Sequence, residues 1–274
     1  FDINWKDRIG EFSYFAGFNV SDNTNKITKY LGNVVYSEGI NTALPGMPIN
    51  SIFGYRSLGY FQSAEEVAQS AKQFGTTNQA PGDIKYEDVN GDKLINGGTG
   101  TPEDHGDLVY LGNTSPRYNF GVNLGAQWKN FDFSVFLQGT GRRSYIIYPT
   151  QALPFVQSWR YPLDNYIDNY WTEENRNARF PRPLAGGGTN TRINSAFVQN
   201  GAYVRLKNLQ IGYTLPSTLL SKVKIQKARI FFSGQDIWTA TKAWYKYFDP
   251  ESPANVSYAY PYFAVYALGI NVNF

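Results

Sequence analysis

An acidic stretch in the first third of the chain carries the residue types and the spacing of a calcium-binding loop. Its oxygen-bearing groups, at positions one, three, five, seven and nine, are Asp88, Asn90, Asp92, the backbone carbonyl of Leu94, and Asn96. Calcium prefers such oxygen ligands, and a bound ion would make a long loop rigid without taking part in catalysis. The pattern therefore predicts a structural calcium site between residues 88 and 96.

The same stretch departs from the calcium-binding pattern at two positions. Lys93 stands where a glycine is usual at position six, and Thr99 stands where a bidentate glutamate is usual at position twelve. Asp104 or Asp107 would have to complete the ligand set. The alternative is a turn rich in Asp and Asn, whose side chains cap the loop through hydrogen bonds to its own backbone.

Aromatic residues further along the chain have the chemistry to bind a sugar, because sugars dock flat against aromatic rings. The candidates for contact with a cargo molecule, or with a lid that covers it, are Trp159, Tyr161, Trp171, Trp244, Tyr245 and Tyr247. The alternative is that these rings pack within their own loops. Lysines alternate with aromatics from Lys242 to Tyr247, but this short run is too small for a nucleic-acid surface.

No cluster of residues indicates an enzyme. Helical spacing in one long loop predicts a short helix from Leu163, Ile167 and Tyr170. That helix would place Asp164 and Asp168 on one face, but carboxylates one turn apart on a surface helix are ordinarily solvated and are not a glycosidase pair. His105, the single histidine, lies in a loop-like stretch, so neither a catalytic centre nor a required cofactor is expected.

The composition narrows the fold class. The 274 residues are 42% hydrophobic and 17% aromatic but only 17% charged, against about 25% charged in an average soluble domain. The absence of cysteine excludes disulfides and cysteine-bearing zinc sites. Basic and acidic residues nearly balance, and the net charge of +3 is too small to indicate nucleic acid as a partner. No window reaches the roughly 18 apolar residues of a membrane helix, so a place in a bilayer would require strands.

Residues 118–128 give the clearest structural pattern. Every even position is apolar or aromatic, and every odd position is Asn, Gly or Gln. This period of two is typical of a strand with one apolar and one polar face. A two-residue turn at 129–130 and a second alternating run over 131–140 complete a predicted hairpin.

Other segments extend this pattern to seven predicted strands, with the further ones near residues 1–6, 11–21, 202–215, 228–240 and 263–274. The apolar phase slips between Leu206 and Leu209, which predicts a bulge. Short turns are predicted at 6–10, 129–130 and 216–226. Long loops are predicted near 50–117, 141–201 and 242–261.

The alternation of short and long connections favours an all-β fold, a transmembrane segment of an antiparallel β-barrel with long extracellular loops. Outer-membrane barrels have short periplasmic turns and longer extracellular loops, whereas a soluble sandwich, the alternative, mixes both lengths at both ends. Aromatic residues near strand ends, such as Trp5 and Trp128, fit the girdles at the membrane surfaces. Single-chain bacterial barrels have even strand numbers, so about seven strands are not expected to close alone.

Several motifs occur in a fixed order along the chain. They are GDIKYEDVNGD at 82–92, DLVYLGNTSPRYNFG at 107–121, YWTEEN at 170–175, FPRP at 180–183, GAYVRLKNLQIGYTLP at 201–216, SGQDIW at 233–238 and FDPE at 248–251. Together they resemble the C-terminal part of SusC/RagA-type TonB-dependent transporters. The resemblance covers nearly the whole chain, 1–274, and several motifs in one order are more specific than any one of them.

The resemblance implies an active transporter in the outer membrane of Bacteroidetes-type bacteria, a multi-pass plugged barrel of roughly 22 strands. It implies import of oligosaccharides or oligopeptides under a lid formed by a SusD-like surface lipoprotein. No plug-like stretch is visible, so the TonB complex is expected to act through upstream parts of the protein. The rivals are a soluble all-β carbohydrate-binding module, which folds in water without detergent, and a passive porin, which needs no proton-motive force.

The last predicted strand has a separate expected role. It carries Ile270, Val272 and Phe274 on one face and ends on the aromatic residue. Such an end resembles the signal that the barrel-assembly machinery reads. The physical reason is that a closed barrel must pair its last strand with its first to remove the open sheet edge.

Overall fold

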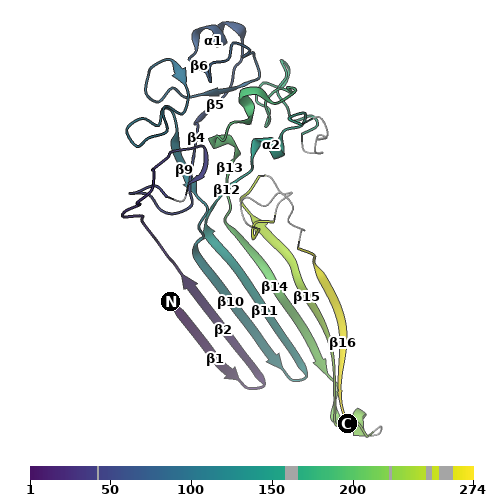
Figure 1. Cartoon of the computed structure of the whole chain (residues 1–274). Helices are drawn as coiled ribbons and strands as arrows, with labels where there is room; N and C mark the ends of the chain where they lie inside the picture. Colours follow the sequence, from purple (N-terminus) through teal and green to yellow (C-terminus); the bar gives the residue numbers. More distant parts are fainter. Residues whose placement is uncertain (42, 158–165, 222–223, 245–248, 253–261) are drawn as a thin grey trace.

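Figure 1 shows the computed structural model, which describes residues 1–41, 43–157, 166–221, 224–244, 249–252 and 262–274. Seven strands form one sheet, called the main sheet here: β1 (Asp2–Ile9), β2 (Phe12–Ser21), β10 (Arg117–Trp128), β11 (Phe131–Arg142), β14 (Tyr203–Thr214), β15 (Lys227–Thr241) and β16 (Val265–Asn273). They lie side by side in chain order, and each is antiparallel to its neighbours. The expectation of an antiparallel all-β fold is confirmed.

Each of the first two hairpins has a two-residue turn between its strands. Lys129 and Asn130 connect β10 to β11 as expected, and Lys129 has the positive φ of 53° that such tight turns require. The turn predicted at residues 6–10 was wrong, because β1 continues to Ile9, which pairs with Phe12. The turn there is Gly10 and Glu11, and glycine accommodates its φ of 60° without a steric cost.

The bulge predicted in β14 is confirmed. The register shifts between Leu206 and Asn208 where β14 pairs with β15, and the pairing with β11 shifts at the same place. Lys207 is the extra residue. As a result Leu206 and Leu209 lie opposite Leu137 and Val135, so both leucines stay on the same face of the sheet.

The main sheet has two chemically different faces. One row of paired residues across it is Trp5, Ala16, Leu124, Val135, Leu209, Gly234 and Tyr266. The adjacent row is Asn4, Gly17, Asn123, Phe136, Asn208, Gln235 and Val265. Because successive residues of a strand point to opposite sides, these rows define an apolar face and a mainly polar face, whose row here includes the apolar Phe136 and Val265.

The apolar face is open to its surroundings in the described part of the chain. Trp5 is 60% exposed, Ile270 is 66% exposed and Leu268 is 83% exposed. Of the buried apolar side chains in the described ranges, Ala228 alone belongs to a strand of the main sheet. A soluble β-sandwich would bury such a face against a second sheet, and no second sheet covers it among the residues described here.

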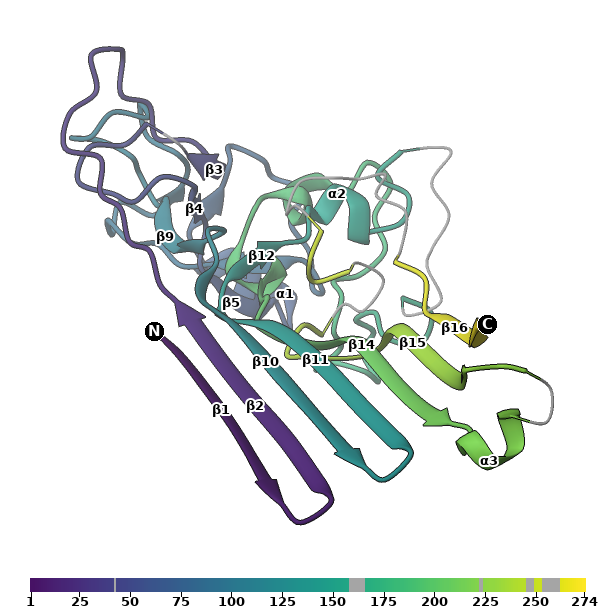
Figure 2. The same cartoon turned by 90° about the horizontal axis from the view of Figure 1, so that it is seen from below.

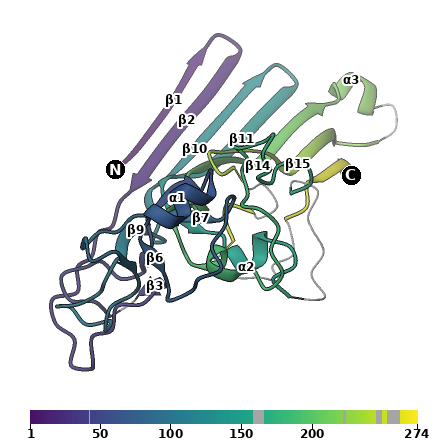
Figure 3. The same ribbon diagram turned by 90° about the horizontal axis from the view of Figure 1, so that it is seen from above.

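The long connections gather beyond one end of the main sheet, and we call this part the loop region (Figures 1 and 2). Its strands are β3 (Gly39–Asn41), β4 (Ser51–Gly54), β5 (Ser57–Tyr60), β6 (Lys72–Gln73), β7 (Ile84–Tyr86), β8 (Leu94–Ile95), β9 (Val109–Asn113), β12 (Ser144–Ile146) and β13 (Val198–Asn200). Its helical turns are α1 (Ala64–Gln69), α2 (Pro149–Ala152), η1 (Gly188–Thr191) and η2 (Ser195–Phe197). Figure 3 looks down on α1 and α2 within it, while α3 (Ser217–Leu220) lies at the opposite end. No helix among the described residues is long and apolar enough to cross a membrane.

The hydrophobic core lies in the loop region. It joins side chains from distant parts of the chain, namely Tyr55, Ile84, Tyr86, Ile95, Leu108, Tyr145, Ile147, Ala152, Leu153, Tyr166, Phe180 and Phe197. Burial raises the pKa of the Tyr55 hydroxyl to about 12. The loop region is therefore a folded body with its own core.

A buried polar cluster ties the two longest loops together. The Arg182 guanidinium donates two hydrogen bonds to the Asp83 carboxylate, at 2.8 and 2.9 Å, and Asn190 donates a third at 2.9 Å. Asp83 is 2% exposed. Beside it, Gly82 has a φ of 88°, and a Cβ there would lie 2.5 Å from Cε3 of Trp171. The Gly82–Asp83 pair thus serves packing between loops.

The short helix predicted from Leu163, Ile167 and Tyr170 is not formed by the part of this segment that the structure describes. Tyr166 and the two residues after it form a turn, and Asp168 has a φ of 65°, which a helix does not allow. Tyr166 instead stacks on Tyr170 at 5.4 Å between ring centroids and contacts Phe180. Burial of these rings in the core of the loop region stabilises the turn, although the spacing of the apolar residues favours a helix.

Replacing Asp83 by alanine should loosen the loop region locally. The substitution leaves the partly buried Arg182 without its carboxylate, at a cost of up to about 3 kcal/mol in the free energy of local opening. Hydrogen exchange of the amides in residues 80–95 and 180–197 measures this change. The control is Glu87→Ala, which removes the exposed pair with Arg56 and should cost about 0–1 kcal/mol. Equal exchange in the two variants would contradict the assigned role of Asp83.

Candidate functional site

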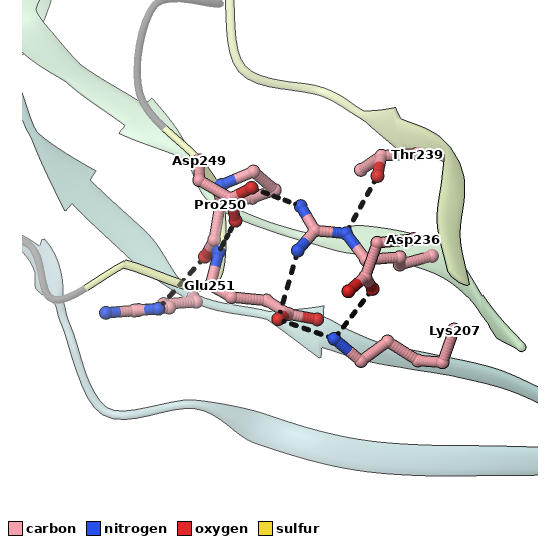
Figure 4. Close-up of polar contacts among 8 residues, drawn as sticks. Lys207, Asp236, Thr239, Asp249, Pro250 and Glu251 are labelled. Carbon is pink, nitrogen blue, oxygen red and sulfur yellow. Dashed lines mark hydrogen bonds and ion pairs between the residues drawn. The ribbon is translucent and has the colours of Figure 1, made fainter. Parts of the chain in front are cut away.

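The polar face of the main sheet carries a cluster of buried charges near the loop region (Figure 4). The Arg205 side chain is 3% exposed; its Nη1 lies 3.0 Å from Glu251, and its Nη2 pairs with Asp249. Its Nε donates to the Thr239 hydroxyl at 2.8 Å. Glu251 also lies 3.1 Å from Nζ of Lys207. A buried cation held on three sides by oxygen atoms is well compensated.

This cluster fixes the segment 249–252 against the strands. Asp236, in the bulged part of β15 with a φ of 53°, adds a carboxylate 2.9 Å from Nζ of Lys207. Arg143, just after β11, donates hydrogen bonds to the backbone carbonyls of Pro250 and Ser252 at 3.1 and 3.3 Å. The register shift between β14 and β15 therefore has a second effect, because the irregular backbone of β15 turns the Asp236 side chain toward the cluster.

A second charge pair crosses the polar face nearer the short turns. Nε of Arg229 donates to Asp132 at 2.8 Å, and Nη2 donates to Gln210 at 2.9 Å. These residues come from β15, β11 and β14. The polar face is therefore lined with hydrogen-bonding and charged groups along its length, as the wall of a water-filled or plugged lumen would be.

The acidic stretch predicted to bind calcium is folded as a series of side-chain-capped turns. The Asp88 carboxylate accepts the N–H groups of Gly91 and Lys93 at 2.8 and 2.9 Å. Asn90 and Asp92 each accept the N–H two residues ahead, at 3.0 and 2.7 Å. Within the described residues no group of three or more acidic, histidine or cysteine side chains is placed to hold a metal. The calcium site remains a prediction.

The remaining predicted ligands also bind the backbone. Asn96 accepts the N–H of Gly98 at 2.6 Å, and the two Asp107 oxygens accept from Val89 and Asn96 at 2.8 and 2.9 Å. The backbone N–H of Thr99 holds the pKa of Asp104 below its usual value. Leu94 is in β8, and His105 stacks on Tyr36 at 5.1 Å, in keeping with a loop residue.

Two of the six aromatic candidates can be placed, and both pack inside the loop region. Trp171 is 7% exposed and covers Gly82. Trp244 lies beneath the Arg179 guanidinium, 3.6 Å from the ring centroid, and contacts Phe180. The candidates Trp159, Tyr161, Tyr245 and Tyr247, like Asp164, lie outside the described residues. Contact with cargo remains a prediction for all six.

Sequence reasoning missed the groups that hold the loops in place. Arg205, Lys207 and Asp249 fall within the motifs that suggested the family resemblance. Arg205 and Asp249 are 44 residues apart in the sequence, and nothing in the motifs shows that they are in contact. One missed element did have a signal. Ser63 caps α1 by accepting the N–H of Glu66 at 3.2 Å, and Ser-x-x-Glu is a recognised start of a helix.

The terminal strand β16 pairs along β15 and places Ile270 opposite Ile230 and Val272 opposite Ala228. Phe274 follows the last strand residue and is 83% exposed. The three residues predicted to form an assembly signal therefore lie on or beside the apolar face. The far edge of β16 has no paired strand among the described residues.

Sequence comparison finds relatives over the whole chain, although no family model matches it. TonB-dependent receptor P3 of Formosa agariphila is 28% identical, with 100% of this chain and 28% of the relative covered. TonB-dependent receptor P26 of the same organism is 26% identical over 97% of this chain and 28% of its own length. The chain thus spans between a quarter and a third of these relatives.

Solved structures share the fold. One structure of the RagAB peptide transporter matches with a TM-score of 0.74 at 20% identity, covering 100% of this chain and 28% of the matched chain. The RagAB peptide importer in its closed-closed state gives a TM-score of 0.68 at 22% identity, with 29% of that chain covered. The resemblance of this chain to SusC/RagA-type TonB-dependent transporters is thus confirmed, by sequence relatives over its full length and by a shared fold.

Proposed function

We propose that this chain forms part of the barrel wall and extracellular loops of a TonB-dependent importer in the bacterial outer membrane. In this proposal the whole barrel has roughly 22 strands around a plug. TonB drives rearrangement of the plug, which lies in other parts of the protein, and a SusD-like surface lipoprotein closes over the captured cargo. The chain itself carries out no catalysis.

The observation that carries the proposal is the open apolar face of the main sheet. Its exposed rows of Trp, Leu, Ile and Tyr suit the hydrocarbon of a bilayer, and the neighbouring rows of Asn, Gly and Gln suit an aqueous interior. Continuous strand pairing also satisfies backbone N–H and C=O groups where water is absent. A soluble carbohydrate-binding module would leave the same apolar face in water, at a large cost in free energy.

The proposed cargo is an oligopeptide or an oligosaccharide. The RagAB structures are those of a peptide importer, which supports the peptide. Aromatic residues of the loops, including the six candidates, would serve either cargo or the lipoprotein lid. A calcium ion at Asp88–Asn96 would add rigidity to the loop, since carboxylate oxygens that accept N–H groups retain lone pairs for a cation.

Uptake of labelled cargo by intact cells tests the transport proposal. Cells with the full-length protein should accumulate a labelled peptide or oligosaccharide pool, and deletion of TonB or addition of a protonophore should abolish that accumulation. Deletion of the transporter alone provides the baseline. Uptake that continues without the proton-motive force would favour a passive porin, and recovery of the protein in the aqueous fraction would favour a soluble module.

Two neighbouring residues of β10 test the assignment of the faces to lipid and lumen. Leu124→Lys places a charge on the apolar face and should cost roughly 2–4 kcal/mol if that face meets the middle of the bilayer. Asn123→Lys, one residue away on the polar face, should cost far less. Urea-dependent folding of the full-length protein into lipid vesicles measures both. Equal destabilisation by the two substitutions would argue against the assignment.

Removal of Phe274 tests the proposed contact with the barrel-assembly machinery. The deletion should lower the amount of full-length protein in the outer membrane, because the terminal residues Ile270, Val272 and Phe274 would no longer present an aromatic end. Replacement of Phe274 by tyrosine should restore the level. Unchanged outer-membrane levels of the deletion variant would remove the support for a signal role.

A further inference from the structure

A cavity of about 250 Å³ lies where the main sheet meets the loop region. Its walls come from the segment after β2, from Pro48, from β9 and the start of β10, and from the junction of β11 and β12. Three arginines line it, with asparagine, serine and threonine between them, and none of its lining residues is acidic. The cavity therefore combines positive charge with neutral hydrogen-bonding groups.

Two of these arginines face each other across neighbouring strands. Arg117 of β10 and Arg142 of β11 are direct partners in the antiparallel register. Like charges directly opposite each other destabilise a sheet, so this pair needs an anion nearby. Asp22 compensates the charge of Arg117, because its carboxylate accepts hydrogen bonds from Nε and Nη2 of that arginine.

Arg142 is exposed to solvent and has no such carboxylate partner among the described residues. It makes no side-chain hydrogen bond and no ion pair with any residue that the structure describes. A guanidinium at the wall of a cavity, opposite another guanidinium and without a carboxylate of its own, is a site of positive potential. Its fork of N–H donors matches a planar carboxylate in bidentate geometry.

Arg143 adds a second uncompensated charge. Its three hydrogen bonds all go to backbone carbonyls, those of Thr114, Pro250 and Ser252, at 3.1, 3.1 and 3.3 Å. Within the described ranges it has no carboxylate partner. Burial lowers the pKa of Arg143, but arginine keeps its proton at any physiological pH. The cavity thus has two more positive charges than the single Asp22 balances.

We propose that this cavity binds a carboxylate group of the cargo, with Arg142 as the direct contact and Arg143 as a nearby charge held in place by the loops. The inference rests on the proposed transport function for the source of that carboxylate. The volume is below the roughly 300–1,000 Å³ of pockets for whole drug-sized ligands. The cavity therefore accepts one acidic unit, either the end of a peptide or a uronic-acid residue of a glycan.

Binding to the purified full-length transporter with its lipoprotein, in detergent, tests the proposal. One pair of probes is a labelled hexapeptide acid and its C-terminal amide, and the other is tetragalacturonate and its methyl ester. In one of these pairs the acid should bind roughly tenfold or more tightly than its blocked form. The pair that shows the difference identifies the source of the carboxylate. Inorganic sulfate, as a free anion, should compete with the acid probe but not with its blocked form.

The variant Arg142→Gln should remove this preference by lowering the affinity of the acid probe to that of the blocked probe. Arg176→Gln is the matched control, because Arg176 is an exposed arginine of the loop region outside the cavity. Arg142→Lys keeps the charge without the fork and should give an intermediate affinity for the acid. It also provides a second test if the glutamine variant folds poorly.

Two results would overturn the proposal: equal binding of acid and blocked probe by the unaltered protein in both pairs, or an unchanged acid preference in Arg142→Gln. Neither result bears on transport, because binding in detergent does not depend on TonB. Conversely, uptake that proves independent of TonB would reject the importer and leave the binding preference in place. The two proposals can therefore fail separately.

Discussion

Pairing between adjacent strands of the main sheet is the constraint on which the rest of the structure depends. Each strand between β1 and β16 in the main sheet pairs with the strands on both sides of it, so the register of one hairpin fixes the next. The register in turn decides which side chains share a face. The apolar rows, the charge clusters of the polar face and the positions where the loops begin all follow from it.

The strands could be predicted from sequence because their signal is local. Alternation over 118–128 needs no knowledge of any partner, and the slipped phase after Leu206 indicated the bulge. The turn at residues 6–10 was misjudged because charged Lys6 and Arg8 read as a loop, although they lie within β1, which runs to Ile9. Charged residues occur both in turns and on the polar face of a strand, so their presence does not distinguish the two.

The loop region could not be predicted in the same way, because its order comes from contacts between distant residues. Asp83 and Arg182 are 99 positions apart, and their pairing leaves no periodic trace. Trp171 and Trp244 lie in the loop region, but composition alone does not distinguish a ring that packs, as Trp171 does, from one that binds. The acidic stretch posed the same difficulty, since Asp and Asn cap turns with the oxygens that would bind calcium.

Because the loops have a hydrophobic core of their own, the two halves of the molecule can change independently. The residues that pack around Tyr55 and Phe180 lie outside the strands of the main sheet, so substitutions among them should disturb the strand register little. The surface of the loop region can then be remodelled while the main sheet keeps its strand pairing. Identities of 20–28% alongside a retained fold are what such a division of labour between scaffold and variable surface would produce over long divergence.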